Sequence, residues 1–244
     1  MGGNGWSSAG VADVSQTMFD LIVRDVVAPR FGIRRSDRVL DVGCGGMPFA
    51  YATHLADLSL TDHSGRFGLP VPIGERPVYE CSVEEMPFED GEFDFVYCSH
   101  VLEHVGDPAA ACRELMRVGR RGYVECPRSW TEIVFSAPDH RWLVDLECGV
   151  LVFREKLTLE AGDPLGLRFA IFPLLDQPAF RTHWDTPRMR RLRTVQLLWE
   201  GEFAFAVISA EERSGRRERP PVVPAAVRDA VVGAVFEALV PEAA

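Results

Sequence analysis

The stretch RVLDVGCGG, residues 38–46, decides the fold class of this chain. Its apolar part stops at glycines, as a buried strand does where it meets a turn. Gly43 and Gly45 let the chain turn tightly and let a ligand approach the backbone without a Cβ in the way. In open sheets of parallel strands, ligands bind outside the carboxyl ends of the strands. The stretch therefore predicts a buried first strand followed by a ligand-binding loop.

Strands alternate with helices after this loop. The later strands are expected in short apolar runs bounded by turn residues, at 58–61, 77–81, 93–98 and 122–126. Helices are expected over 49–56 and from Asp107-Pro108, where Asp caps the helix and Pro fills its first turn. This alternation indicates βαβ units and a parallel sheet, which is the α/β class. Residues 194–199 and 203–209 flank a short turn and predict an antiparallel hairpin.

Composition excludes several classes of partner. The net charge of −10 argues against a nucleic acid or an anionic membrane, since both need a basic surface. No apolar run approaches the roughly 20 residues that span a bilayer, and the first residues lack the features of a secretory signal. The expected location is therefore the cytoplasm. The six cysteines form no CxxC pair and are expected to be reduced, mostly buried thiols.

An acidic residue ends the expected second strand. Asp62 lies 21 positions after Asp41, where an acid accepts hydrogen bonds from the ribose hydroxyls of a nucleotide. Loops that bind dinucleotides read GxGxxG, but Pro48 stands where their third glycine would be. A nicotinamide-dependent oxidoreductase is therefore disfavoured and kept as an alternative.

Four blocks carry a resemblance to a known family. They are VLDVGCG at 39–45, EEMPFEDGEFDFV at 84–96, SHVLEHVGDP at 99–108 and ELMRV at 114–118. Their order and spacing resemble class I S-adenosylmethionine-dependent methyltransferases, in the type 11 branch related to quinone biosynthesis. The resemblance covers residues 38–127. It implies S-adenosylmethionine as cofactor, S-adenosylhomocysteine as product, and methyl transfer to O, N or C of a small, aromatic or carboxylated metabolite.

The resemblance also implies roles for cofactor-binding residues. Asp41 and the loop Gly43-Cys44-Gly45 would hold the methionine moiety, and Ser99 would lie near it. The nucleoside would meet Asp62 at the ribose, His63 beside the adenine, and Ser82 with Val83 at the adenine edge. The family often has glycine at the position of Met47 and aspartate at that of Ser82. These departures keep a second alternative, a catalytically inactive scaffold protein that binds S-adenosylmethionine.

The implied fold is a Rossmann-like three-layer sandwich with a mainly parallel, seven-stranded sheet that ends in the antiparallel hairpin. The methyltransferase domain is expected over 11–210, with 128–193 inserted as an acceptor site or lid. A disordered segment over 1–10 precedes it. A linker over 211–224 and a terminal helix over 225–241 follow, and terminal helices are the expected contacts of a homodimer.

Three histidines are candidates for catalysis. His140 lies in the irregular region that follows the fifth strand, and an imidazole can take a proton from an acceptor near neutral pH. His100 and His104 follow the fourth strand. They also match the HxxEH pattern of a zinc-peptidase group, in which two imidazoles share one helical face. Because the sequence identifies no third ligand, no metal is expected.

Overall fold

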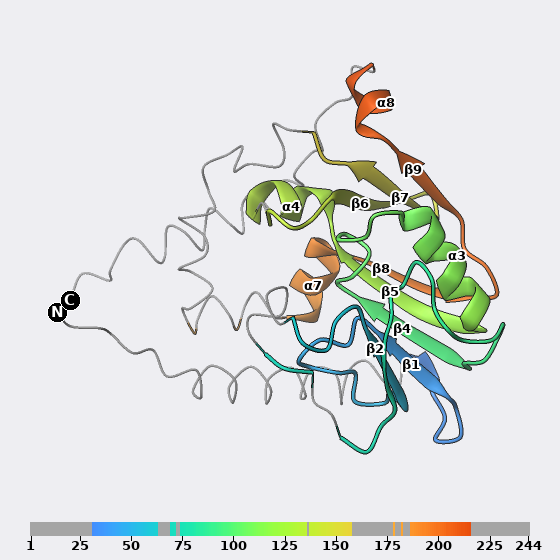
Figure 1. Ribbon diagram of the computed structural model, residues 1–244. Coiled ribbons are helices and arrows are strands. Elements are labelled where there is room, and N and C mark those ends of the chain that lie inside the picture. The colour runs from blue at the N-terminus through green and yellow to red at the C-terminus, as the bar shows by residue number, and fades with distance from the viewer. Residues whose placement is uncertain are drawn as a thin grey trace, which may run out of the picture.

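The computed structural model describes residues 31–62, 69–71, 74–135, 137–157, 178, 182 and 186–215. His63, the segment 1–10 and the expected terminal helix 225–241 lie outside these residues, so the predictions for them are not addressed. Figure 1 shows a central sheet with short helices around it.

The main sheet has the strand order β3-β2-β1-β4-β5-β8. Its strands are β1 (Val39–Val42), β2 (His54–Asp57), β3 (Val78–Glu80), β4 (Phe95–Ser99), β5 (Arg121–Pro127) and β8 (Thr194–Glu200). The first five run parallel, and β8 pairs antiparallel with β5. This confirms the α/β Rossmann-like class, although the described sheet has six strands rather than seven.

The helix expected over 49–56 is wrong. Residues 54–57 form β2, which pairs with β1 on one side and β3 on the other. The crossover from β1 to β2 runs through turns, and the Thr53 hydroxyl fixes its end by accepting from the Val39 N–H at 2.9 Å. The apolar spacing in this segment is too short to separate the helical period from the strand period. Pairing with two neighbouring strands satisfies the backbone hydrogen bonds of residues 54–57, so they form a strand rather than a helix.

The hairpin expected over 194–209 is also wrong. β8 joins the main sheet, whereas β9 (Phe205–Ile208) pairs parallel with β7 (Val150–Glu155) in a second sheet that is completed by β6 (Trp142–Glu147). Between β8 and β9, Gly201 takes a φ of +70° and its N–H bonds the Arg120 carbonyl. Phe203 and Phe205 can then pack on the main core, which a tight hairpin would not allow.

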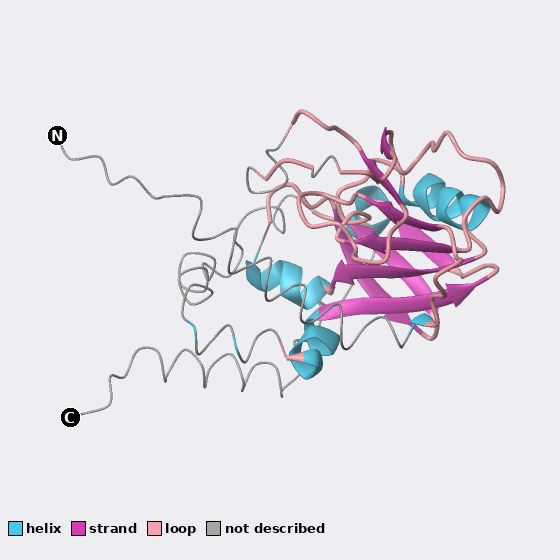
Figure 2. Cartoon of the chain, turned by 90° about the horizontal axis from the view of Figure 1, so that it is seen from below, coloured by secondary structure: helices cyan, strands magenta, loops and turns pink. Residues whose placement is uncertain are grey.

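Two cores cover the two faces of the main sheet. One includes α3 (Pro108–Val118) and inward residues of β6 and β7. As expected, Asp107 caps α3 by accepting from Ala109 and Ala110. The other core is aromatic and includes Phe31, Phe49 and Tyr97. Figure 2 shows the strands side by side, with the helices outside the sheet.

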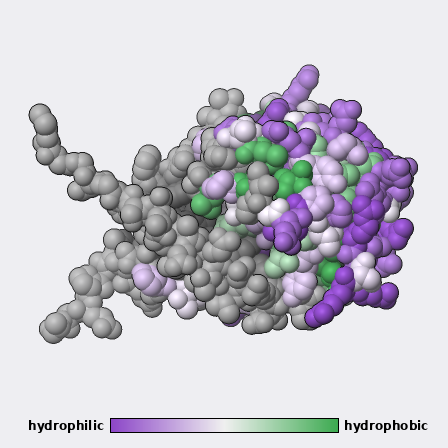
Figure 3. Space-filling view, turned by 60° about the horizontal axis from the view of Figure 1, so that its bottom comes forward, coloured by the Kyte–Doolittle hydropathy of each residue, from purple (hydrophilic) through white to green (hydrophobic). Residues whose placement is uncertain are grey.

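The short helices α4 (Ser129–Phe135), α7 (Pro187–Arg193) and α8 (Ala210–Ser214) complete the described chain. α8 occupies the start of the expected linker and buries Arg213. Within the described residues, no helix has the length and apolar character needed to cross a membrane. On the described part of the face in Figure 3, hydrophilic residues predominate on the right and hydrophobic residues gather mainly in the upper middle.

Candidate functional site

The glycine loop follows β1 at the carboxyl edge of the parallel strands. Gly43 and Gly45 have φ of +66° and +54°, the left-handed region that glycine adopts without strain. Gly43 and Cys44 donate to the Ala56 carbonyl at 2.8 and 3.1 Å. A Cβ on Gly43 would lie 2.2 Å from the Val101 side chain. The loop therefore needs glycine at 43 both for its turn and for its contact with the segment after β4.

Asp57, not Asp62, ends the second strand. The Asp57 carboxylate accepts from the Gly45 N–H at 2.9 Å, and its backbone carbonyl accepts from the Cys81 N–H at 2.9 Å. Asp62 lies five positions later in an exposed loop, where its N–H donates to the Ser59 hydroxyl. The shift follows from the position of β2, which is four residues earlier than expected.

Asp41 lies inside β1 and is only 3% exposed. Its carboxylate accepts from the Phe49 N–H at 2.7 Å and so closes the glycine loop. Burial raises the pKa of Asp41 to about 7. In the protein alone, Asp41 is thus a buried acid beneath the loop rather than a side chain that points into solvent.

Other residues expected to bind cofactor also lie at this edge. Ser82 follows β3, accepts from the Glu84 N–H at 3.1 Å, and stands beside the buried Val83. Ser99 is the last residue of β4 and pairs in register with Glu125 of β5. With the strand order β3-β2-β1-β4, these residues lie on neighbouring strand ends around the glycine loop.

His100 does not begin a helix, so the helical HxxEH geometry is wrong. Residues 102–104 form a turn, and His100 itself has a φ of +58°. A non-glycine residue in this region is uncommon and marks sites where the surrounding structure holds the backbone. The ring lies 3.3 Å from Glu103 and 3.7 Å from Glu125. Burial lowers the pKa of His100, but the two carboxylates outweigh it and raise the pKa to about 9.

A buried charge pair joins β5 to α7. Glu125 is 1% exposed and accepts from Arg190 Nε and from Arg190 Nη2, both at 2.8 Å. The Tyr123 hydroxyl donates to the same carboxylate. Burial would raise the pKa of Glu125, but the charges of His100 and Arg190 outweigh burial and lower it to about 2. The sequence predicted neither partner, although the arginine-rich segment at 188–193 was a signal for an anionic contact.

A second network holds His140. Its Nδ1 pairs with Glu132 of α4, which is 3% exposed and also receives a hydrogen bond from Lys156. His104 lies beside it, with the ring centroids 4.5 Å apart and the rings perpendicular. The structure therefore brings together His104 and His140, two of the three expected catalytic residues, although they are distant in sequence.

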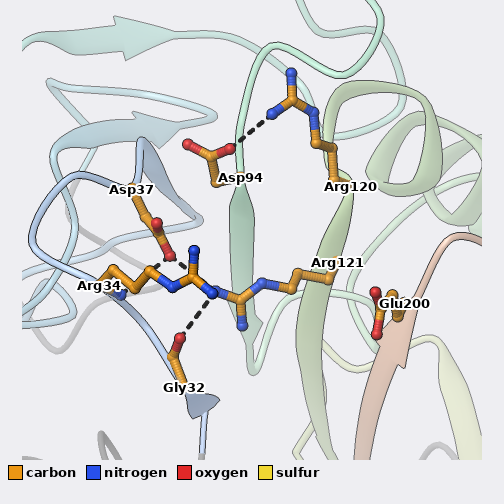
Figure 4. A pocket seen from close by; sticks show the side chains of 7 residues that line it. All are labelled: Gly32, Arg34, Asp37, Asp94, Arg120, Arg121 and Glu200. Carbon is orange, nitrogen blue, oxygen red and sulfur yellow. Dashed lines mark hydrogen bonds and ion pairs between the residues drawn. The ribbon is translucent and has the colours of Figure 1, made fainter.

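The hollow drawn in Figure 4 lies away from this edge. It has a volume of about 440 Å³ and is lined by residues just before β1 and β4, at the start of β5 and at the end of the antiparallel β8. Four of its charged side chains pair with one another, Arg121 with Asp37 and Arg120 with Asp94, each at 2.8 Å. Ligands of parallel sheets bind at the opposite, carboxyl edge.

Comparisons with known proteins find similarity to several methyltransferases. Residues 40–124 match a family model described as a methyltransferase domain. The chain is 37% identical over 94 residues to a ubiquinone biosynthesis O-methyltransferase of Aromatoleum aromaticum, across 34% of this chain and 40% of that protein. It is 30% identical over 198 residues to the sterol 24-C-methyltransferase erg6 of Schizosaccharomyces pombe, across 71% of this chain and 51% of that protein.

These matches confirm the resemblance to class I S-adenosylmethionine-dependent methyltransferases of the type 11 group. The chain spans 40 to 51% of the length of those two relatives. Among solved structures, the YcgJ protein from Bacillus subtilis is 20% identical, with a TM-score of 0.38 over 51% of this chain and 60% of that one.

Proposed function

We propose that this protein transfers the methyl group of S-adenosylmethionine to O, N or C of a small, aromatic or carboxylated metabolite. The observation that carries the proposal is the junction of the glycine loop with Asp57, inside the segment that matches a methyltransferase domain. A nicotinamide reading has no comparable support, and a binding-only scaffold is the outcome that the experiments below must exclude.

The residues at this edge fit the proposed cofactor. Gly43 and Gly45 present backbone without a Cβ, and Asp57 stands at the strand end where an acid accepts from ribose hydroxyls. Ser82 and Val83 would then contact the adenine, and Asp41 supports the loop from below. We move the ribose role from Asp62 to Asp57 because Asp57 is the acid that ends β2.

When bound, S-adenosylmethionine supplies a methyl group already activated by a positively charged sulfur. The protein mainly has to align the acceptor and exclude water. For a hydroxyl acceptor, His140 offers an imidazole whose Nδ1 is fixed by Glu132, which leaves Nε2 free to take the proton. His100 is less suited to this task, because the carboxylates beside it raise its pKa to about 9.

Cofactor binding is tested with matched aspartate variants. Asp57→Ala removes charge-assisted hydrogen bonds of about 1.5–3 kcal/mol, so S-adenosylhomocysteine should bind at least roughly tenfold more weakly by calorimetry. Asp62→Ala should bind as the wild type does. Equal affinity in all three proteins would contradict our placement of the ribose.

Catalysis is tested separately with methyl-labelled cofactor and a panel of hydroxylated and carboxylated aromatic acceptors. Wild type should label at least one acceptor, and NAD should not raise its melting temperature as S-adenosylhomocysteine does. Binding of S-adenosylhomocysteine without any labelled product would favour the scaffold reading.

A further inference from the structure

Three potential metal ligands converge beside the carboxyl end of β4. Glu103 and His104 belong to the turn after that strand, and His140 belongs to the loop before β6. Each offers one ligand atom, and these atoms all lie within 4.8 Å of one another. We propose that Glu103, His104 and His140 form a binding site for a divalent transition metal ion such as Zn²⁺.

The Glu103 carboxylate is buried and has room for a further partner. Its side chain is 1% exposed, and His100 Nδ1 forms an ion pair with Oε1 at 3.3 Å, although the geometry is not that of a hydrogen bond. The second oxygen, Oε2, accepts no hydrogen bond from a described residue. Buried carboxylate oxygens normally have a partner, because leaving them without one is costly. A cation at the cluster would supply that partner.

In both histidines, Nδ1 already lies beside a carboxylate. His140 Nδ1 pairs with Glu132, and His104 Nδ1 lies 3.4 Å from the Asp139 carboxylate. Metal-binding histidines typically use one nitrogen for the ion and donate the other N–H to a carboxylate or carbonyl, which fixes the tautomer. Nε2 of each ring is therefore the nitrogen that faces the ion.

Hydrogen bonds connect the backbone segments that carry the three ligands. The Glu103 carbonyl accepts from the Arg141 and Trp142 N–H groups at 2.7 and 3.2 Å, which ties the turn to the loop that carries His140. The Trp142 indole N–H also donates to the Val105 carbonyl at 2.8 Å. Supporting contacts of this kind keep ligands near a productive geometry.

The donor set selects the kind of ion. Two imidazoles and one carboxylate suit Zn²⁺ and other first-row divalent ions, whereas Mg²⁺ and Ca²⁺ prefer oxygen. Zinc bonds of about 2.0–2.2 Å require ligand atoms about 3.4 Å apart in a tetrahedron. The atoms have to close by roughly an ångström, and His104 can rotate because its side chain is 36% exposed. Three protein ligands leave a fourth position for water or an acceptor oxygen.

We expect the metal to bind whether or not the cofactor is present. A metal on Nε2 of His140 would exclude the role of that nitrogen as proton acceptor. Chelator-treated protein is titrated with ZnCl₂ by calorimetry, with and without S-adenosylhomocysteine. We expect one ion per chain in both titrations. Co²⁺ should give the visible absorption of a four-coordinate site with nitrogen and oxygen ligands, which reports the ligand set without any assay of activity.

Single substitutions identify the ligands. His104→Gln, His140→Gln and Glu103→Gln should each weaken Zn²⁺ binding at least about tenfold, the smallest loss typical even of supporting residues. His54→Gln is the matched control, since His54 lies at the start of β2, outside the cluster. His104→Gln is the decisive variant, because a partly exposed side chain can be replaced without loss of the fold.

Absence of stoichiometric binding to the wild type would overturn the proposal and leave His140 as the proton acceptor. Binding that is unchanged in His104→Gln and His140→Gln, while both variants keep the wild-type circular dichroism, would also overturn it. Loss of Zn²⁺ binding with retained affinity for S-adenosylhomocysteine would support the site and separate it from the proposed methyl transfer.

Discussion

Two buried carboxyl groups in one sheet behave in opposite ways. Asp41 in β1 is 3% exposed, and Glu125 in β5 is 1% exposed. Burial raises the pKa of Asp41 to about 7, whereas the charges of His100 and Arg190 outweigh burial at Glu125 and lower its pKa to about 2. Burial thus raises the pKa of a carboxyl group in this sheet, and a nearby cation decides whether that group stays charged near neutral pH.

The surroundings differ in the same way. Around Asp41, the loop is held by backbone groups close in sequence, such as Phe49 N–H and Gly45 N–H. Around Glu125, the charged partners come from other elements of the fold, with Arg190 65 positions away. The first region is suited to holding a ligand by its backbone, and the second to holding charged side chains in fixed places.

The largest effect is expected from removing the cation of the second region. Arg190→Met removes the hydrogen-bonded cation of the buried Glu125 and leaves it only the more distant His100 and the Tyr123 hydroxyl. The free energy of unfolding should therefore fall by about 3–5 kcal/mol, measured by denaturant titration. Arg188→Met is the control on the same helix, and its exposed side chain predicts a change within about 0.5 kcal/mol. Equal effects would mean that the pair contributes nothing beyond helix packing.

The next largest effect is expected at Asp41 and depends on pH. The folded protein retains a proton that the unfolded chain releases above pH 4, so this group lowers stability as pH rises from about 4 to 7. At about 1.4 kcal/mol per pKa unit, Asp41→Asn should be more stable than wild type by up to roughly 4 kcal/mol at pH 8. Near pH 4 the two proteins should unfold alike. A constant difference at all pH values would contradict the raised pKa.

A smaller effect is expected at the glycine loop. Gly43→Ala places a Cβ on a residue in the left-handed conformation, which costs about 1–2 kcal/mol. The same Cβ would also press against the Val101 side chain, which is partly exposed and can shift. We expect a total loss of about 2–3 kcal/mol in unfolding free energy. Gly74→Ala is the control, since its Cβ would meet nothing within 4 Å. If Gly43→Ala lowered the unfolding free energy no more than Gly74→Ala does, the loop would tolerate a side chain at position 43.

Sequence patterns predicted the local features of the fold well. The first strand and its glycine loop, the cap of α3 by Asp107 and the strands β3, β4 and β5 follow from short apolar runs and their boundary residues. The motif spacing also indicated the methyltransferase resemblance, which the match over 40–124 confirms. These features depend on residues that are close in sequence. There, the conformational preferences of the residues and the spacing of the apolar ones act directly.

Pairing between distant segments decided the rest. The sequence placed the strand-end acid at Asp62, but pairing with β1 and β3 sets β2 so that Asp57 ends it. The sequence pattern also predicted a hairpin over 194–209. In the structure, Phe203 and Phe205 pack on the core and β9 pairs with β7 instead of β8.

The sequence by itself thus determined which strand carries the ligand loop and which chemistry that loop resembles. Only the tertiary structure decided which charges meet: Arg190 with Glu125, Lys156 with Glu132, and His100 with both Glu103 and Glu125. The reason is physical. A local pattern sets the period and the ends of an element, whereas the energy of a buried charge depends on a partner that the chain brings from far away.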